Sequence, residues 1–290
     1  MVDRSVDPAK ADDVIIDITD AALARQALYD FLVSTSPTGE LVIDLRDDVL
    51  DKLVDLAPTG RSLPDTPTAS GRPPDLQSGL RLATIEDGPQ WDKAEHFVYD
   101  TYLALGYTDE SADEQVEELK AYRSLSRFHC AVDEDDNIVG SLRVILGEYH
   151  QLPVGQFPRI DFSDEEPMCH MSSIVVDPAA RSTGVIEHLY REGWADGLRW
   201  GARTITGLSE KWMLDGFRKV YCMPFVPCGL PEWYMGGEVI PIAMSTSPEA
   251  MAEVARTNPE FWWWNIETLT AEEIERHGFA ALTKDALLRS

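Results

Sequence analysis

Basic residues are scarce in this sequence. Its 290 residues include 51 acidic and only 25 basic side chains, which gives a formal net charge of −26. Proteins that bind nucleic acids or anionic membranes need clustered Lys and Arg to contact phosphate groups. The charge balance therefore argues against nucleic-acid and membrane partners, and it is typical of a solvated acidic surface that keeps a protein soluble.

Cysteines and long apolar runs are also few. Cys130, Cys169, Cys222 and Cys228 have neither CxxC spacing nor the close spacing of a zinc knuckle. The first residues, MVDRSVDPAKADD, hold no apolar segment of the kind that a signal peptide needs. No run approaches the ~20 apolar residues of a membrane span. We therefore expect reduced thiols, no metal site and a cytoplasmic location.

Composition divides the chain into four parts. Residues 1–57 alternate short strand-like and helix-like segments, and we expect an N-terminal α/β extension there. Residues 58–78 are rich in proline and poor in large apolar side chains, which is typical of an extended linker. Residues 79–245 carry the long periodic segments of a folded domain, and 246–290 read as a helical tail that packs on it.

Hydrophobic periodicity predicts ten elements in residues 79–245, in the order β-α-α-β-β-β-α-β-α-β. The predicted strands are 80–86, 128–132, 138–146, 168–176, 204–208 and 238–244, and the predicted helices are 91–105, 113–122, 186–198 and 212–220. In the helix 186–198, Gly193 and Gly197 lie on the apolar face, so we expect this helix to pack close to a sheet.

The tail has clear helix signals and an aromatic cluster. Ser247 precedes Pro248 as an N-cap, Thr270 begins a capping box, and Gly278 suits a C′ position. The cluster 261–264, Phe-Trp-Trp-Trp, is too hydrophobic for exposure to water. We expect it to seal one edge of the core rather than to bind a ligand.

A short polar turn connects the predicted strand 168–176 to the predicted helix 186–198. It contains Arg181, Ser182, Thr183 and Gly184. A helix N-terminus offers unpaired N–H groups and a partial positive charge, so small residues there can hold a phosphate. The turn is neither a Walker loop nor a GxGxxG dinucleotide motif. Taken alone, it fits an anion site and an ordinary strand-to-helix connection equally well.

The order of elements around this turn resembles that of the GNAT superfamily of acyl-CoA-dependent N-acyltransferases. The family's turn reads Gln/Arg-x-x-Gly-x-Gly/Ala, and this sequence keeps Arg181 and Gly184 but has Ile186 in place of the last small residue. The segments SSIVVDP (172–178) and LDGFRKV (214–220) are also similar to family elements. Within the superfamily, Ile186 and the segment GGEVIPIAM (236–244) resemble the subgroup of acyl-homoserine lactone synthases and N-acyl amino acid synthases.

The resemblance covers roughly residues 80–245 and implies an α+β fold with a mixed, largely antiparallel central sheet flanked by helices. It further implies that the pantetheine arm of acyl-CoA lies between two splayed central strands. The pyrophosphate would lie on the turn formed by Arg181, Ser182, Thr183, Gly184, Val185 and Ile186, and the backbone N–H groups of Ile174, Val175 and Val176 would polarise the thioester carbonyl. The implied activity is acyl transfer to the amine of a small molecule such as an amino acid.

A general base must make the attacking amine neutral. Glu210, just after the predicted strand 204–208, is the first candidate, His170 the second and Glu148 the third. A histidine inside a strand is, however, more often a core residue. The family's usual tyrosine acid is replaced by Trp212 here, and Tyr221, one turn beyond Phe217, is the substitute that the sequence offers.

The sequence leaves several alternatives open. The donor is acyl-CoA or an acyl carrier protein, and we favour CoA because carrier proteins are acidic, unless Arg181, Arg191, Arg199 and Arg203 form a basic patch. Two alternatives to an enzyme are an inactive acyl-CoA-binding or regulatory module with the same fold, and an assembly subunit. For residues 1–57 the sequence leaves two roles open. The segment covers an exposed edge of the sheet, or it contacts a second copy of the chain in a homodimer.

Overall fold

A computed structural model gives the structure of the protein and describes residues 71–160, 167–181 and 183–287. The predicted extension 1–57 and the linker up to residue 70 lie outside these residues, so both stay predictions. None of the described helices has the length and apolar character needed to cross a lipid bilayer.

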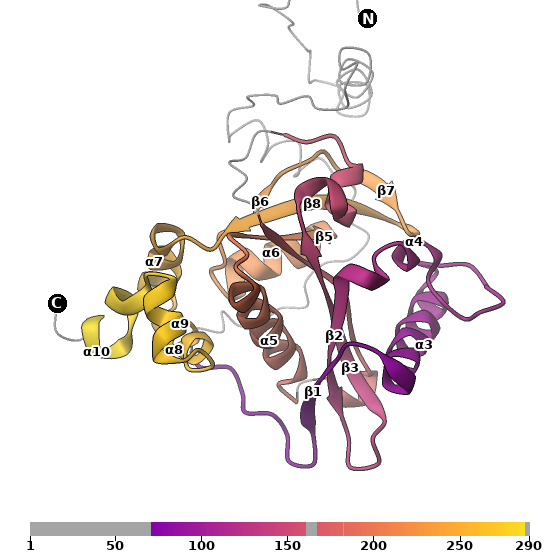
Figure 1. Cartoon of the computed structure of the whole chain (residues 1–290), viewed down its shortest axis with the longest axis horizontal. Helices are drawn as coiled ribbons and strands as arrows, with labels where there is room; N and C mark the ends of the chain where they lie inside the picture. The colour runs from indigo at the N-terminus through magenta and orange to yellow at the C-terminus, as the bar shows by residue number, and fades with distance from the viewer. Residues whose placement is uncertain (1–70, 161–166, 182, 288–290) are drawn as a thin grey trace, which may run out of the picture.

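The centre of the molecule is a twisted sheet of eight strands within the described residues (Figure 1). Its spatial order is β1-β2-β3-β4-β5-β8-β6, with β7 also paired to β8, and only β4 and β5 run parallel. The strands are β1 (Arg81–Ile85), β2 (Ser126–Val132), β3 (Ile138–Gly147), β4 (Met168–Val176), β5 (Thr204–Ser209), β6 (Val226–Pro227), β7 (Glu232–Tyr234) and β8 (Gly237–Ser245). The predicted mixed, largely antiparallel sheet is confirmed.

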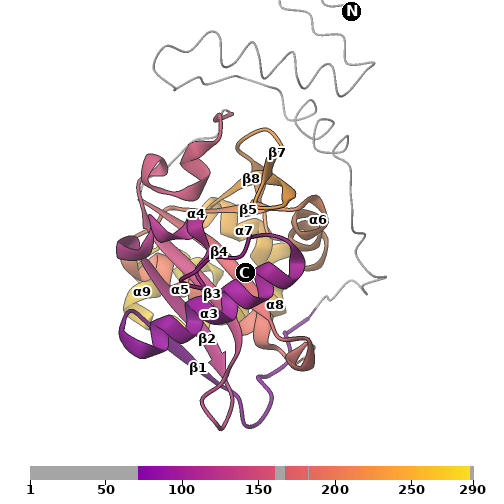
Figure 2. The same ribbon diagram turned by 90° about the vertical axis from the view of Figure 1, so that its right-hand side faces the viewer.

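Helices cover both faces of this sheet. One face carries α3 (Gly88–Leu105) and α4 (Glu117–Lys120), and Figure 2 shows α3 lying across strands β2 and β3. The opposite face carries α5 (Val185–Trp200), with α6 (Lys211–Val220) and the tail helices beside it (Figure 1). The tail helices are α7 (Pro248–Thr257), α8 (Pro259–Ile266), α9 (Ala271–Arg276) and α10 (Lys284–Leu287). Short 3₁₀ helices are η2 (Arg123–Leu125), η3 (Tyr149–Gln151), η4 (Pro153–Gln156), η5 (Pro178–Ala180) and η6 (Phe279–Leu282).

Helix α5 packs unusually close to the sheet, as its two glycines predict. A Cβ atom at Gly193 would lie 2.7 Å from Leu142 Cδ2, and one at Gly197 would lie 2.9 Å from Cys169 Sγ. Any larger residue at either position would push the helix away from β3 and β4. The helix ends at Gly201, whose φ of 98° is the left-handed conformation that glycine adopts at helix ends.

The C-terminal tail packs on α5 through its aromatic residues. Phe261, Trp262 and Trp264 are buried, and Trp194 of α5 lies edge-on to Trp262 with 5.9 Å between ring centroids. The predicted caps at Ser247 and Thr270 are present, because each side chain accepts a hydrogen bond from the first turn of its helix. These contacts join the tail and the domain into one core.

Two details differ from the sequence prediction. The predicted helix 113–122 is limited to α4, and the residues before it form turns in which the Ser111 hydroxyl bonds to the Gln115 backbone. This local side-chain bond competes with helical pairing and delays the helix start. The strands β6 and β7 were not predicted, since strands of two and three residues are too short to show periodicity.

Candidate functional site

The two parallel strands in the middle of the sheet separate along their length. Pairing between β4 and β5 runs from Met168 opposite Thr204 to Met171 opposite Gly207. Beyond Met171 the strands continue to Val176 and Ser209 without pairing to each other. The gap opens where β4 also has a bulge, because its register against β3 shifts next to Ser173, whose φ is 49°.

A cleft of about 760 Å³ lies along this gap on the face that carries α3. One wall is β4, and the opposite wall comes from the end of β5, the start of α6 and the β7–β8 hairpin. One end is the turn before α5. The lining residues that matter below are Tyr102, Tyr107, His170, Ser173, Ile174, Val175, Val176, Arg181, Gly184, Val185, Ile186, Glu187, Glu210, Trp212, Tyr234 and Met235.

The turn at the end of the cleft keeps its backbone N–H groups available. Gly184 is the N-cap of α5 with a φ of 80°, and no side chain caps the helix. Within the described residues, no hydrogen bond uses the N–H groups from Gly184 to Glu187. Four such groups at the positive end of a helix dipole are suited to bind an anion.

The side chains of the turn are arranged unevenly. Arg181 is exposed and lines the cleft. The Thr183 hydroxyl instead donates to the Ala180 carbonyl at 2.5 Å, so it caps the turn internally. Glu187 lines the cleft and accepts a hydrogen bond from the Tyr221 hydroxyl at 3.2 Å. Ser182 lies outside the described residues.

Residues 71–78 border the turn. The Gln77 N–H donates to the Thr183 carbonyl at 3.2 Å, and Pro74 lines the cleft. A Cβ atom at position 184 would lie 2.9 Å from the Pro74 carbonyl oxygen. Gly184 is therefore required twice, for its left-handed backbone and for this close approach.

A carboxylate stands on the other side of the gap. Glu210 follows β5 directly and is the N-cap residue of α6. Its Oε1 accepts from the Tyr107 hydroxyl at 2.5 Å, and its Oε2 accepts from Trp212 Nε1. Two donors from different elements thus fix the orientation of this carboxylate inside the cleft.

The other two predicted catalytic residues are placed less favourably. His170 is buried, its Nδ1 lies 3.0 Å from Thr206 Oγ1, and burial lowers its pKa to about 3. It is a neutral and weak base, which favours the core interpretation. Tyr221 is not among the residues that line the cleft, and burial next to Glu187 raises its pKa. Glu148, the third candidate base, is exposed and caps η3 outside the cleft.

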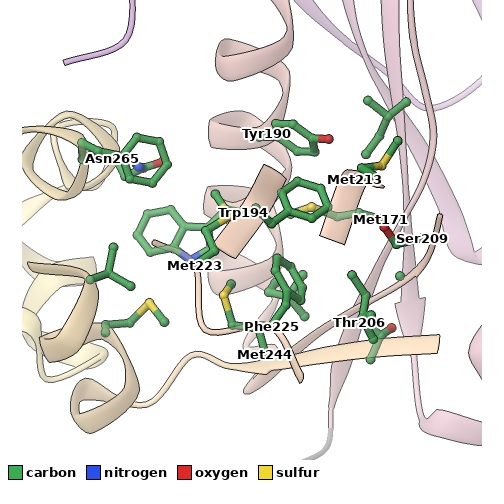
Figure 3. A pocket seen from close by; sticks show the side chains of 18 of the residues that line it. Met171, Tyr190, Trp194, Thr206, Ser209, Met213, Met223, Phe225, Met244 and Asn265 are labelled. Carbon is green, nitrogen blue, oxygen red and sulfur yellow. Dashed lines mark hydrogen bonds between the residues drawn. The ribbon is translucent and has the colours of Figure 1, made fainter. Parts of the chain in front are cut away.

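A second space lies behind the gap, on the face that carries α5. It is an apolar cavity of about 60 Å³ enclosed by α5, α6, β5, β8, α7 and α8, and Figure 3 shows its lining. Five methionines line it: Met171, Met213, Met223, Met244 and Met251. Met171, Ile174, Leu208 and Met213 line both the cavity and the cleft, so the two spaces adjoin at the gap.

Tyr102, Tyr107 and the apolar cavity were not predicted as parts of a site. Tyr102 lies on the apolar face of α3 and therefore resembles a core residue in the sequence. Burial raises its pKa, while a hydrogen bond with Ser173 acts in the opposite direction. Phe261 and Trp262 line the apolar cavity as well as packing the core. Hydrophobic periodicity in the sequence does not show which residues line the cleft or the cavity, because that depends on which elements face the gap between β4 and β5.

The part of the chain that the structure describes has neither a cluster of metal ligands nor a cysteine in the lining of the cleft. Within the described residues, no group of three His, Cys, Asp or Glu side chains is close enough to hold a metal ion. All four cysteines are free, and burial raises the pKa of Cys130 to about 12. A thiol with so high a pKa stays protonated and is a poor nucleophile at neutral pH.

Comparison with known proteins gives structural matches only. No model of a protein family matches the sequence, and no curated protein does. A CoA-dependent acyl-homoserine lactone synthase, BjaI, solved with SAM and isopentyl-CoA, is similar at 12% identity and a TM-score of 0.50, over 70% of this chain and 100% of that one.

Two further solved structures are similar at lower TM-scores. FeeM, an N-acyl amino acid synthase from uncultured soil microbes, matches at 15% identity and a TM-score of 0.46, over 60% of this chain and 95% of FeeM. A GCN5-related N-acetyltransferase from Kribbella flavida matches at 19% identity and a TM-score of 0.41, over 58% and 98%. At such low identity a likeness concerns the fold alone. At that level, the predicted GNAT-like fold is confirmed.

Proposed function

We propose that the protein is an N-acyltransferase that moves an acyl group from the thioester of acyl-CoA to the primary amine of a small molecule. The observation that carries this proposal is the gap between β4 and β5. It joins an anion-binding helix end, a held carboxylate and an apolar cavity at one point of the sheet. An acyl-CoA donor needs a site for its phosphates and an apolar site for its acyl chain, and an amine acceptor needs a base.

In this proposal the pyrophosphate of CoA lies on the N–H groups of Gly184, Val185, Ile186 and Glu187, with Arg181 adding a positive charge. The pantetheine arm follows β4 beyond Met171. There β4 no longer pairs with β5, so the backbone groups on that side of the strand are available to hydrogen-bond an extended chain. N–H groups of Ile174 to Val176 are the candidate donors to the thioester oxygen, and such donors stabilise the oxyanion that forms during attack.

The acyl group extends through the gap into the apolar cavity. The free volume there is small, but methionine side chains have several rotatable bonds and adapt to what they contact. Each methylene group that enters contributes about 0.8 kcal/mol. We therefore propose a medium or long acyl chain as the preferred group, and free CoA rather than a carrier protein as its carrier.

The reaction forms a C–N bond and breaks the C–S bond of the thioester. The acceptor arrives as an ammonium ion and loses two protons overall. Glu210 accepts the first, directly or through water, and passes it to solvent. The second reaches the departing sulfur, from water or from a phenol in the cleft such as Tyr102. The products are an amide and free CoA thiol.

The direct test is to follow free thiol release from acetyl-, octanoyl- and dodecanoyl-CoA with a panel of primary amines. The proposal predicts thiol release that depends on the amine, formation of the matching amide, and a preference for the longer chains. Binding of CoA without turnover on any amine would instead favour an acyl-CoA-binding module, and absence of CoA binding would contradict both functions.

Glu210→Gln tests the proposed base, because it keeps the size and polarity of the side chain. Loss of a general base lowers the rate by about 10²- to 10⁴-fold. Tyr107→Phe is the matched variant, since it leaves the carboxylate in place and removes one of its two donors. It should act mainly on the KM for the amine. An unchanged kcat in Glu210→Gln would rule out this base.

A further inference from the structure

The part of the cleft around Glu210 combines one negative charge with aromatic side chains. Tyr107 and Trp212 contact the carboxylate through their polar atoms, and Tyr102 lies against the Tyr107 ring with 5.6 Å between centroids. Tyr234 and Met235 of the β7–β8 hairpin line the same space. A carboxylate with aromatic rings around it is suited to hold an ammonium ion on an apolar body.

Among the described residues that line the cleft, no cation from the walls around Glu210 balances its charge. Among the described lining residues, Arg181 is the one Lys or Arg side chain, and it lies at the turn where the proposed donor binds. Lys211 is next to Glu210 in sequence but lies outside the lining, and its ammonium is 3.7 Å from Asp215 Oδ2.

Arg143 is the cation behind the Tyr102 wall, and it is already engaged. Its guanidinium donates to the Leu119 carbonyl at 3.0 Å and to Ser126 Oγ at 2.9 Å, and it lies 3.8 Å from Glu95. The side chain is buried and does not line the cleft. An acceptor that carried a carboxylate beside its amine would therefore meet Glu210 without a cation to pair with.

We infer that the acceptor is a primary amine without a carboxylate, carried on an aromatic or alkyl body. This inference rests on the proposed function and narrows its acceptor class. It separates the protein from enzymes that acylate amino acids. Such an acceptor places its ammonium on Glu210 and its body against Tyr102, Tyr107, Trp212 and Tyr234. Burying an unpaired carboxylate beside a second carboxylate is strongly unfavourable, and this excludes the amino-acid analogue.

The test compares phenethylamine, phenylalanine and phenylalanine amide as acceptors for octanoyl-CoA. The three share one body and differ in the group beside the amine, which is hydrogen, a carboxylate or a neutral amide. We expect kcat/KM for phenethylamine and for the amide to exceed that for phenylalanine by at least about tenfold, because like charges in a partly dry cleft repel. Equal rejection of the amide and the acid would point to size rather than charge and would overturn the inference.

A second test uses the variant Glu210→Gln. Its turnover is expected to fall, so the quantity measured is the binding of each amine by calorimetry in the presence of CoA. The variant should bind phenethylamine more weakly and reduce its advantage over phenylalanine. If phenylalanine is the better acceptor of the unchanged protein, the inference fails while the proposed function stands. CoA binding with no binding or acylation of phenethylamine overturns the inference alone, and failure of CoA to bind overturns both.

Discussion

Gly184 is the residue on which donor binding depends most in this account. Its φ of 80° and the Pro74 carbonyl, 2.9 Å from where a Cβ atom would lie, leave no room for a side chain. Gly184→Ala should raise the dissociation constant for octanoyl-CoA by about tenfold or more. Left-handed backbone costs a non-glycine residue roughly 1–2 kcal/mol, and the helix end that holds phosphate must shift as well.

The matched control for this variant is Gly201→Ala at the other end of α5. Gly201 has a φ of 98°, but nothing lies within 4 Å of its added Cβ atom. It should lose the stability that the left-handed backbone alone costs, as thermal unfolding will show, while calorimetry shows unchanged affinity for octanoyl-CoA. If the two variants bind the donor equally well, the turn does not hold phosphate.

His170 gives a pH-dependent prediction. Burial lowers its pKa from 6.5 to about 3 in the folded protein. As the pH falls below 6.5, the unfolded chain binds a proton that the folded chain refuses, so stability is lost between pH 6.5 and about 3. The slope from this residue is at most about 1.4 kcal/mol per pH unit.

His170→Asn should flatten this acid limb in denaturant unfolding measured over the same pH range, because asparagine does not titrate and can still contact Thr206. Its kcat/KM near neutral pH should fall much less than that of Glu210→Gln. An unchanged pH slope would mean that His170 already binds its proton in the folded state. A rate loss as large as that of Glu210→Gln would give His170 the role of base.

At the scale of elements, the gap between β4 and β5 controls how far an acyl chain reaches. Met213 of α6 lines both the cleft and the apolar cavity, whereas Met251 of α7 lines the cavity alone. Met213→Trp should block the passage and lower kcat/KM for octanoyl- and dodecanoyl-CoA by about tenfold or more, since several methylenes worth about 0.8 kcal/mol each lose their site. Acetyl-CoA should be little affected.

Met251→Trp is the matched variant, because it fills the apolar cavity without blocking the passage from the cleft. It should reduce the use of dodecanoyl-CoA and spare shorter chains. Overpacking costs typically 1–3 kcal/mol, so thermal unfolding should accompany the rate measurements. If both variants keep the chain-length preference of the unchanged protein, the acyl chain lies elsewhere.

Two helices illustrate which elements could be predicted from the sequence and which could not. Helix α5 was predictable because its apolar residues recur at helical spacing and Gly201 follows its last turn. The helix predicted at 113–122 was too long because the Ser111 hydroxyl holds the preceding residues in a turn. Periodicity records which residues face the core, but it does not record such local side-chain competition.

At the scale of the molecule, the site depends on contacts between distant parts of the chain. Tyr107 and Glu210 are 103 residues apart and meet only because the end of α3 and the end of β5 face one gap. That Glu210 and Arg181 lie in the lining of the cleft was predictable, from the place of one after a strand and of the other in the turn. Tyr102, Tyr107 and the methionine-lined cavity were not, because a core residue and a lining residue have the same pattern in the sequence.

The net charge of −26 also acts at this scale. Acyl-CoA is itself anionic, and an acyl carrier protein presents a larger acidic surface, so like-charge repulsion should slow both donors and the carrier protein more. We expect a higher kcat/KM for octanoyl-CoA than for the octanoyl carrier protein at low ionic strength. The difference should narrow as salt screens the repulsion. A preference for the carrier protein that weakens with salt would point to a local basic patch instead.

The measurement that tests the account most directly is the change in backbone amide NMR signals when CoA is added. The account predicts that the signals of Gly184, Val185, Ile186 and Glu187 shift most, together with those of Ile174 to Val176 along the end of β4. Those amides belong to the N-terminus of α5 and to the end of β4, where β4 still pairs with β3 but no longer pairs with β5. Saturable shifts confined to other parts of the chain, or no shifts at all, would contradict it.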